Sequence, residues 1–382
     1  MNMSRRTFLK STGAAAAAAT LAPQILSCVS EAPANTASAV IPAGKPVTID
    51  ECRSLTPKTM AESSPLIRQS WNYLNQQIGS IKNANLRRLA QDIYADSTPS
   101  FIRFDAARRN EIWKTLSAAG YTKQSESELF PPIPSDIRQS VPYIAAPGSG
   151  YQSHHAYPGG LVTHVAANVL ITNAVVDTYI NTYGYEVDRD TAVTAQLLHD
   201  LHKPWVFQWQ EDAACRGEPS LAGAGEHHVW SLAELLVRNA PADLVVAQAC
   251  AHTHPGASAD EQQIVGWLKA AAIIGGVDPV NYGLLAPGGN TVPLPRKQEG
   301  FICHLGDHDY VLSVPAVQWT LPVLQRIAAA DFRFSDADLK GKPFNSLRNY
   351  IYANYSAMRL EQDYATGGEE AVRRAVRSLI IA

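Results

Sequence analysis

The sequence predicts an all-α fold, and three observations carry that prediction. Apolar residues recur at three- and four-residue spacings over most of the chain after residue 65, which is the period of one helix face. Alternating polar and apolar runs, typical of half-buried strands, are scarce. Hydrophobic residues make up 46% of the 382-residue chain, so a core can form and disorder is excluded for most of it.

Amphipathic patterns place the helices in order. The first three have their apolar positions within residues 66–78, 86–94 and 112–119, and Gly120 ends the third. Residues 130–150, rich in Pro and Gly, and residues 279–295 are predicted loops. Further helices are predicted at 160–183, 188–201, 224–239, 241–253, 260–275, 298–310, 316–331, 345–363 and 368–380.

The N-terminus predicts an export signal. Arg5-Arg6 precedes Phe8-Leu9-Lys10 and an alanine-dominated run over residues 13–22. This run is too short to cross a bilayer, which takes about 20 residues. Paired arginines before a mildly apolar run resemble a twin-arginine signal. We therefore expect export by the twin-arginine route to the periplasm, with an ordinary secretory signal as the alternative.

The segment Ile25-Leu26-Ser27-Cys28 resembles a lipobox, in which Cys28 carries lipid and becomes the mature N-terminus. The prediction is a signal over residues 1–28 and a lipoprotein that meets the membrane through Cys28; a plain cysteine near a cleavage site is the alternative. Residues 29–60, rich in Ala, Pro, Ser and Thr without periodicity, predict a flexible tether. The remaining cysteines form no CxxC pair, so a thiolate zinc site is not expected.

Histidine is confined to one part of the chain. All eleven histidines lie between His154 and His308, which a packing requirement would not produce. Imidazole is the commonest metal ligand and titrates nearest to neutrality. The clustering therefore indicates a metal or acid/base site within one domain. The formal net charge of −3 argues against a protein that coats nucleic acid.

Five segments place imidazole or carboxylate groups on or beside predicted helices: residues 157–164, 197–204, 225–229, 251–255 and 303–309. Ligands on successive helices that face one interior would be spaced in this way. Imidazole and carboxylate donors suit iron, manganese, zinc or nickel. Asp200, next to His199, has two oxygens and can bridge two ions, which would polarise a phosphoryl group and generate a hydroxide nucleophile.

The order His, His-Asp, His, His, Asp resembles the HD superfamily of metal-dependent phosphohydrolases over about residues 150–315. The resemblance implies an HD-domain helical bundle with added helices at both ends. We place a metal-binding domain at 141–335, an N-terminal helical region at 61–140 and C-terminal helices at 336–382. Carried over by position, the resemblance implies two divalent ions whose ligands are His164, His199, Asp200, Asp307, His227 and His252.

Within that set, Asp200 would bridge the ions, and His227 and His252 would complete the second. The near-equivalent alternates are His228, His254 and Asp309. His227 is preferred because Ser231 then falls where the family has a small residue. Departures from the family pattern are His202, in place of a small residue, and the His-Thr-His of the fourth segment.

The predicted catalytic residues are Asp200, Lys203 and His202. Lys203 matches the lysine that follows the family signature and would neutralise a phosphate oxygen; capping of the helix end before Pro204 is the alternative. His202 would add a donor or a ligand. His154 and His155 are either loop residues at the surface or part of the site, and His304 and His308 are expected beside the ligands or exposed.

The resemblance implies a phosphohydrolase that cleaves a small-molecule phosphate mono- or diester, a nucleotide among the candidates, with a metal-bound hydroxide. The alternative is a di-iron HD-type oxygenase, whose ligand order is similar. A second alternative is a sensory module that binds metal without turnover. Release of inorganic phosphate from an added ester, or consumption of oxygen, would separate the three.

Overall fold

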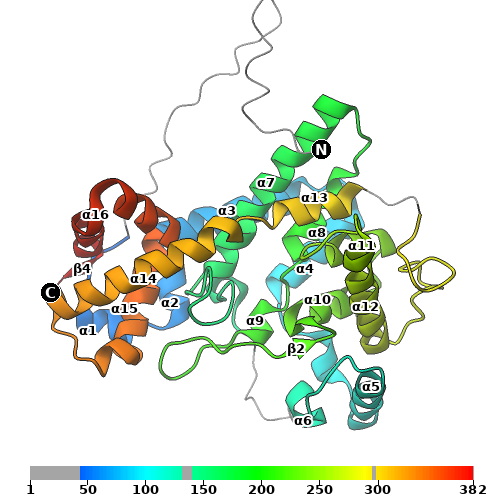
Figure 1. Cartoon of the computed structure of the whole chain (residues 1–382), viewed down its shortest axis with the longest axis horizontal. Helices are drawn as coiled ribbons and strands as arrows, with labels where there is room; N and C mark the ends of the chain where they lie inside the picture. The colour runs from blue at the N-terminus through cyan, green and yellow to red at the C-terminus, as the bar shows by residue number, and fades with distance from the viewer. Residues whose placement is uncertain (1–43, 131–139, 295–297, 382) are drawn as a thin grey trace, which may run out of the picture. The chain divides into compact units, whose positions relative to one another are not determined.

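The computed structural model describes residues 44–130, 140–294 and 298–381, and it confirms the all-α prediction (Figure 1). In this part of the chain, extended structure is limited to two-residue strands: β1 (Val47–Thr48), β2 (Ser220–Leu221), β3 (Ala224–Gly225) and β4 (Ile380–Ile381). These described residues belong to one compact unit, which holds described parts of all three regions placed from the sequence. The signal and Cys28 lie outside the described residues.

Regular secondary structure begins at an earlier residue than the sequence predicted. The helices of the N-terminal part are α1 (Ile49–Ser54), α2 (Pro57–Ser63), α3 (Pro65–Ser80), α4 (Ala84–Ala95), η2 (Ser100–Arg103), α5 (Ala106–Ala118) and α6 (Glu126–Leu129). The predicted tether is therefore wrong after residue 46. Capping explains the error: Thr48 and Glu51 form a capping box on α1, and Thr56 and Ser64 cap helices that begin with proline.

The central helices surround the histidine-rich segments. They are η4 (Tyr143–Ala145), α7 (Gly160–Tyr183), α8 (Arg189–Leu198), α9 (Lys203–Val206), α10 (Glu226–Val237), α11 (Ala242–Ala249), α12 (Ser258–Gly275) and α13 (Gln298–Gly306). Among the described residues, α7 is the one helix long and apolar enough to cross a membrane by length and composition. It packs against α3, α8 and α13, and more than half of its apolar window is buried, as in the core helix of a globular unit.

The C-terminal part consists of α14 (Tyr310–Phe332), η5 (Asp338–Lys340), α15 (Lys342–Tyr355) and α16 (Ala357–Leu379). α14 and α16 pack against each other, and β4 pairs in parallel with β1, which joins the two ends of the described chain. The single helix predicted over 345–363 is wrong. Ser356, at φ 61° and ψ 154°, separates α15 from α16 and caps the latter.

Several predicted helices end early at the site. α8 stops at Leu198 and not at residue 201, because the amides of Leu201 and Lys203 bond carbonyls only three residues back, in tight turns. α11 stops at Ala249, so His252 lies in the turn that follows. Asp200 and His252 thus lie in turns. A turn allows side-chain directions that a continuous helix would not.

A buried carboxylate links the N-terminal part to the core. Glu234 on α10 accepts hydrogen bonds from the Ser100 amide at 2.8 Å, the Ser100 hydroxyl at 2.7 Å and Arg238 Nε at 2.6 Å. His202 Nε2 lies 3.5 Å from the same carboxylate. Burial would raise the pKa of Glu234, but His202, Ser100 and Arg238 lower it to about 2.

We predict that Glu234→Ala lowers the free energy of unfolding by about 3 kcal/mol, since it leaves buried partners unpaired. Because the folded-state pKa is depressed, the contribution of Glu234 is full above its unfolded pKa and is lost as the pH falls toward about 2. Denaturant unfolding at pH 7 measures the change. As a matched control, Glu62→Ala removes an exposed i,i+4 pair with Lys58 and should cost less than about 0.5 kcal/mol. Equal effects of the two changes would contradict the prediction.

Candidate metal centre

A glycine pair sets the start of α7 and, through it, the position of His164. Gly159 lies at φ +79°, in the left-handed region that favours glycine. A Cβ on Gly160 would come 1.8 Å from the carbonyl oxygen of His155, so only glycine allows the preceding loop to approach the helix. His164 follows one turn later and is buried.

The predicted ligands of the first ion converge from α7, the end of α8 and the turn after α13. His164 Nε2 lies 3.2 Å from Asp307 Oδ1, and His199 Nε2 lies 3.3 Å from the same oxygen. Both Nε2 atoms are also 3.2 Å from Asp200 Oδ2. One donor atom of each of His164, His199 and Asp307 lies within 4.8 Å of the others. This group could hold an ion.

Asp200 forms a second group with His227 and His252, next to the first. Its Oδ1 atom lies 3.3 Å from His227 Nε2, while its Oδ2 atom faces the first group. The two oxygens of one carboxylate thus face two sets of imidazoles, which is the geometry of a bridging ligand. His252 Nε2 lies 3.7 Å from Asp307 Oδ2.

Three of these histidines share one orientation. In each, the Nδ1–H group donates to an oxygen and the Nε2 atom points to the carboxylates. The acceptors are the Gln196 carbonyl for His199 at 2.7 Å, Asp309 for His164 at 3.0 Å and Glu218 for His227 at 2.6 Å. Metal-ligating histidines are held in this way, because a hydrogen bond on one nitrogen fixes the lone pair on the other.

The remaining donor atoms fit a divalent ion. His199 Nε2, His227 Nε2 and Asp200 Oδ1 are buried, and among the described residues they face only the other predicted ligands, at 3.2–3.3 Å. Orphaned buried polar atoms are costly, and a bound cation would satisfy all of them. The four cysteines in the described ranges are free and buried, and burial raises the pKa of Cys215 to about 12, so thiolates are not among the donors.

Charge balance in this cluster depends on protons when no cation is bound. Burial would lower the pKa of His199, but Asp200 and Asp307 raise it to about 9. Burial would likewise lower the pKa of His227, and Glu218 and Asp200 raise it to about 9. Burial would raise the pKa of Asp200, yet His199 and Lys203 hold it well below its usual range.

Lys203 is buried beside Asp200. Its Nζ atom lies 2.6 Å from Asp200 Oδ2 and donates a hydrogen bond to the carbonyl of Gly148. The alternative of a C-terminal helix cap is wrong, since Lys203 begins α9 and α8 has already ended at Leu198. Lys203 also lines a cavity of about 460 Å³, whose wall includes His154, His227 and Asp307.

The structure does not bring His202 to the metal groups, which corrects its predicted catalytic role. Its ring packs edge-on against Phe101, at 5.2 Å between centroids, and its Nε2 atom faces Glu234. It is not among the described residues that line the cavity. The turn that aims Asp200 into the cluster turns His202 away from it.

The alternates His228 and His254 also lie outside both groups. His228 is buried behind His252, stacked at 4.4 Å between centroids, and meets Trp267 edge-on. His254 stacks on Phe301, and its Nδ1 atom accepts a hydrogen bond from the Gly256 amide at 2.9 Å. The geometry therefore favours His227 and His252 as donors.

Two supporting residues were missed in the sequence, and a third was misassigned. Asn168 donates to Asp307 Oδ1 at 2.7 Å; its position four residues after His164, on the same helix face, was an available signal. Glu218 orients His227 from a loop, where nothing in the sequence distinguished it. Asp309, expected as an alternate ligand, instead accepts from His164.

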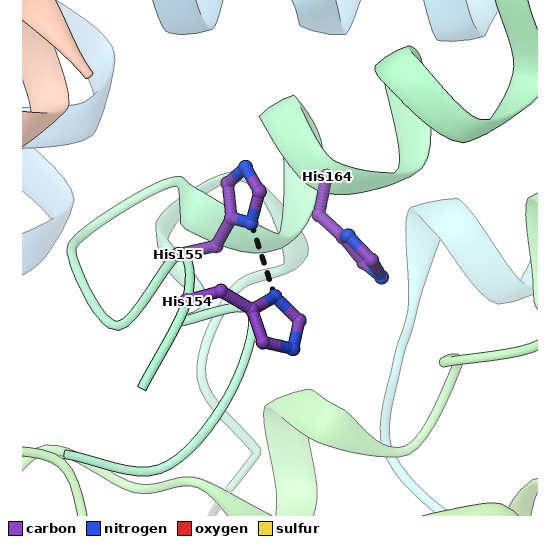
Figure 2. A group of neighbouring side chains, drawn as sticks. All are labelled: His154, His155 and His164. Atoms are coloured by element: carbon purple, nitrogen blue, oxygen red, sulfur yellow. Dashed lines mark hydrogen bonds between the residues drawn. The ribbon is translucent and has the colours of Figure 1, made fainter. Parts of the chain in front are cut away.

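The loop before α7 brings two further histidines to the cluster (Figure 2). His154 and His155 share a hydrogen bond between their Nδ1 atoms at 3.2 Å, and both rings lie 5.2 Å from that of His164. Arg348 on α15 holds this loop: it donates to the Ala156 carbonyl at 3.4 Å and lies over the Tyr151 ring. The C-terminal helices thus support one wall of the cavity.

Comparison with known proteins gave two matches. Residues 2–22 match the family model of the twin-arginine translocation pathway signal sequence, which confirms the twin-arginine prediction and supports export by that route. The dihydroneopterin 2',3'-cyclic phosphate phosphodiesterase of Methanocaldococcus jannaschii is 31% identical over 99 residues. The match covers 26% of this chain and 39% of the relative's length. No solved structure matched the chain.

The ligand order, the two His/Asp groups and the similarity to a phosphodiesterase together bear out the resemblance to HD-type phosphohydrolases. The similarity supports a hydrolase in general, and the two groups are residues that could bind metal.

We predict that the metal content of single-residue variants shows which residues are ligands. Asp200→Ala removes one oxygen from the second group and another that faces His164 and His199 of the first, and it should leave neither ion bound. His227→Ala should release one ion and leave the first group intact. His228→Gln, a change at the adjacent position outside both groups, is the matched control and should retain the wild-type content. Elemental analysis of the purified full chain measures this. Two ions bound to His227→Ala would show that His227 is not a ligand.

We also predict that metal uptake releases protons. The raised pKa values of His199 and His227, about 9, mean that both rings are protonated in the metal-free protein near neutrality, and each must lose its proton to become a donor. Affinity for the ion should rise with pH and level off above about pH 9. Titration calorimetry in buffers of different ionisation enthalpy counts the protons released. A pH-independent affinity between pH 7 and 9 would contradict the assignment.

Proposed function

We propose that this protein is a metal-dependent phosphohydrolase that cleaves a phosphate mono- or diester. The observation that carries the proposal is the placement of Asp200 between two sets of imidazoles, beside a cavity that Lys203, His164 and His227 line. Ions held by these groups would supply Lewis acidity toward a phosphoryl oxygen and lower the pKa of a water molecule.

The residues of this chain would then bind and orient the ester. An ammonium has three N–H donors, and Lys203 uses two of them, on Asp200 and on the Gly148 carbonyl. Its third donor is available to a phosphate oxygen in the cavity. Because Lys203 is 4% exposed, its charge acts in a medium of low dielectric, where it stabilises developing negative charge more strongly than it would in water.

Part of the cavity wall next to Lys203 comes from the loop of residues 148–155. His154 lines the cavity, and burial lowers its pKa well below the usual range, so its ring is neutral. A neutral imidazole can donate to an ester oxygen without repelling bound cations. Phe207 and Tyr310 also line the cavity and offer aromatic faces to an organic group on the ester.

We propose a cyclic phosphodiester as the first substrate class to test. The similar region of the relative belongs to a protein named for the hydrolysis of a 2',3'-cyclic phosphate. Opening of the cyclic ester leaves the phosphate as a monoester. A site in which ions at the two His/Asp groups neutralise phosphate charge would therefore suit both phosphate diesters and phosphate monoesters.

The test is turnover by the full chain, loaded with manganese or iron, on 2',3'-cyclic nucleotides and on phosphate monoesters. Lys203→Ala should keep the metal content and lower kcat by about 100-fold if its contact forms in the transition state. Lys203→Arg should restore little, because a planar fork does not replace a compact ammonium. Oxygen consumption without ester cleavage would favour the oxygenase alternative and overturn the proposal.

For localisation, we propose a periplasmic protein anchored through lipid on Cys28, as the lipobox resemblance implies. Two acyl chains or more bind a membrane far more firmly than one. Cys28→Ala should move the exported protein from the membrane fraction to the soluble periplasmic fraction, with Cys52→Ala as the matched cysteine control. Membrane association that survives the Cys28 change would exclude a lipid anchor at this residue.

A further inference from the structure

Two further histidines lie next to the predicted ligands but outside both groups. His304, on α13, and His308, in the turn that follows, are four residues apart in the sequence. Their rings lie 4.5 Å apart between centroids. Both side chains are partly exposed, and His304 lines the cavity described above. Neither ring belongs to the groups that contain Asp200 or Asp307.

Hydrogen bonds fix the tautomer of both rings. His304 Nδ1–H donates to the carbonyl of Ala251 at 3.0 Å, and His308 Nδ1–H donates to the carbonyl of His304 at 2.6 Å. A carbonyl can only accept, so in the neutral ring the proton resides on Nδ1. The lone pair of each ring is therefore on Nε2, where it is available to a cation.

His254 is a neighbour with the opposite arrangement. Its ring lies 5.2 Å from that of His304, but its Nδ1 atom accepts a hydrogen bond from the Gly256 amide. A neutral ring that accepts at Nδ1 carries its proton on Nε2 and cannot donate a lone pair there. Of these three neighbouring rings, His304 and His308 have a free lone pair on Nε2, and His254 does not.

We propose that His304 and His308 form an additional, partly exposed site for one borderline divalent cation at the wall of the cavity. Two histidines at i and i+4 on one helical face chelate such ions. Imidazole donors select zinc, nickel or copper over magnesium, which prefers oxygen ligands. Water would fill the remaining coordination positions, so we expect weaker binding than in the buried groups. An ion bound here would lie at the cavity wall that His304 shares with His252 and Asp307.

The test is equilibrium dialysis of the full chain against Ni²⁺, with bound nickel counted by elemental analysis and Mg²⁺ present as a hard-ion competitor. Wild type should bind one more ion than His304→Ala or His308→Ala. Loss of one ring removes the chelate, because the second donor no longer acts at high effective concentration, so the dissociation constant should rise by about tenfold or more. Ions in the buried groups enter every count equally and cancel in the difference.

His254→Ala is the matched control and should change the dissociation constant by less than about twofold. His308→Gln, which keeps a polar side chain of similar length, should lose the ion as His308→Ala does, and a wild-type melting temperature in either variant excludes misfolding as the cause. Equal counts in wild type and the His304 and His308 variants would overturn the proposal. So would a loss with His254→Ala as large as with His308→Ala, or displacement by Mg²⁺. None of these results depends on turnover of an ester.

Discussion

The carboxylate of Asp200 is the constraint on which the site depends. It is fully buried, and a buried carboxylate must be paired with positive charge or lose its own. His164, His199, His227 and Lys203 all approach it within 3.3 Å. These partners come from four separate segments, so the need to balance one buried charge fixes how α7, the end of α8, α9 and α10 must meet.

Hydrogen bonds from the imidazoles to neighbouring residues fix the orientation of the rings around Asp200. Asp309, Glu218 and the Gln196 carbonyl each hold one imidazole by its Nδ1 atom. This leaves three Nε2 atoms directed at two carboxylates, so positive charge at these atoms must come from protons on the rings or from a bound cation. The same logic explains why metal and protons compete for the site, since the carboxylates stabilise either form of positive charge.

The added helices also contribute to the site. Arg348 on α15 is buried and holds the loop that bears His154 and His155 against the start of α7. From the same helix, Asn345 and Asn349 bond the carbonyls of Asp212 and Ala213, in the segment between α9 and β2. The C-terminal region is therefore part of the framework that shapes the cavity, and a change there can affect the site without contact with substrate.

The sequence by itself determined the all-α class and the export signal, because helix period and motif spacing are local properties. The resemblance to a known family pointed to His164, His199, Asp200 and Asp307, which the fold brings together, and to His227 ahead of His228. Tertiary structure alone decided where the helices end, that His202 faces Glu234, and that Glu218 supports His227. These depend on turns and on charge pairs between segments distant in the chain, and no residue spacing records them. The tautomers of His254, His304 and His308 were settled by single backbone hydrogen bonds, which only the folded chain defines.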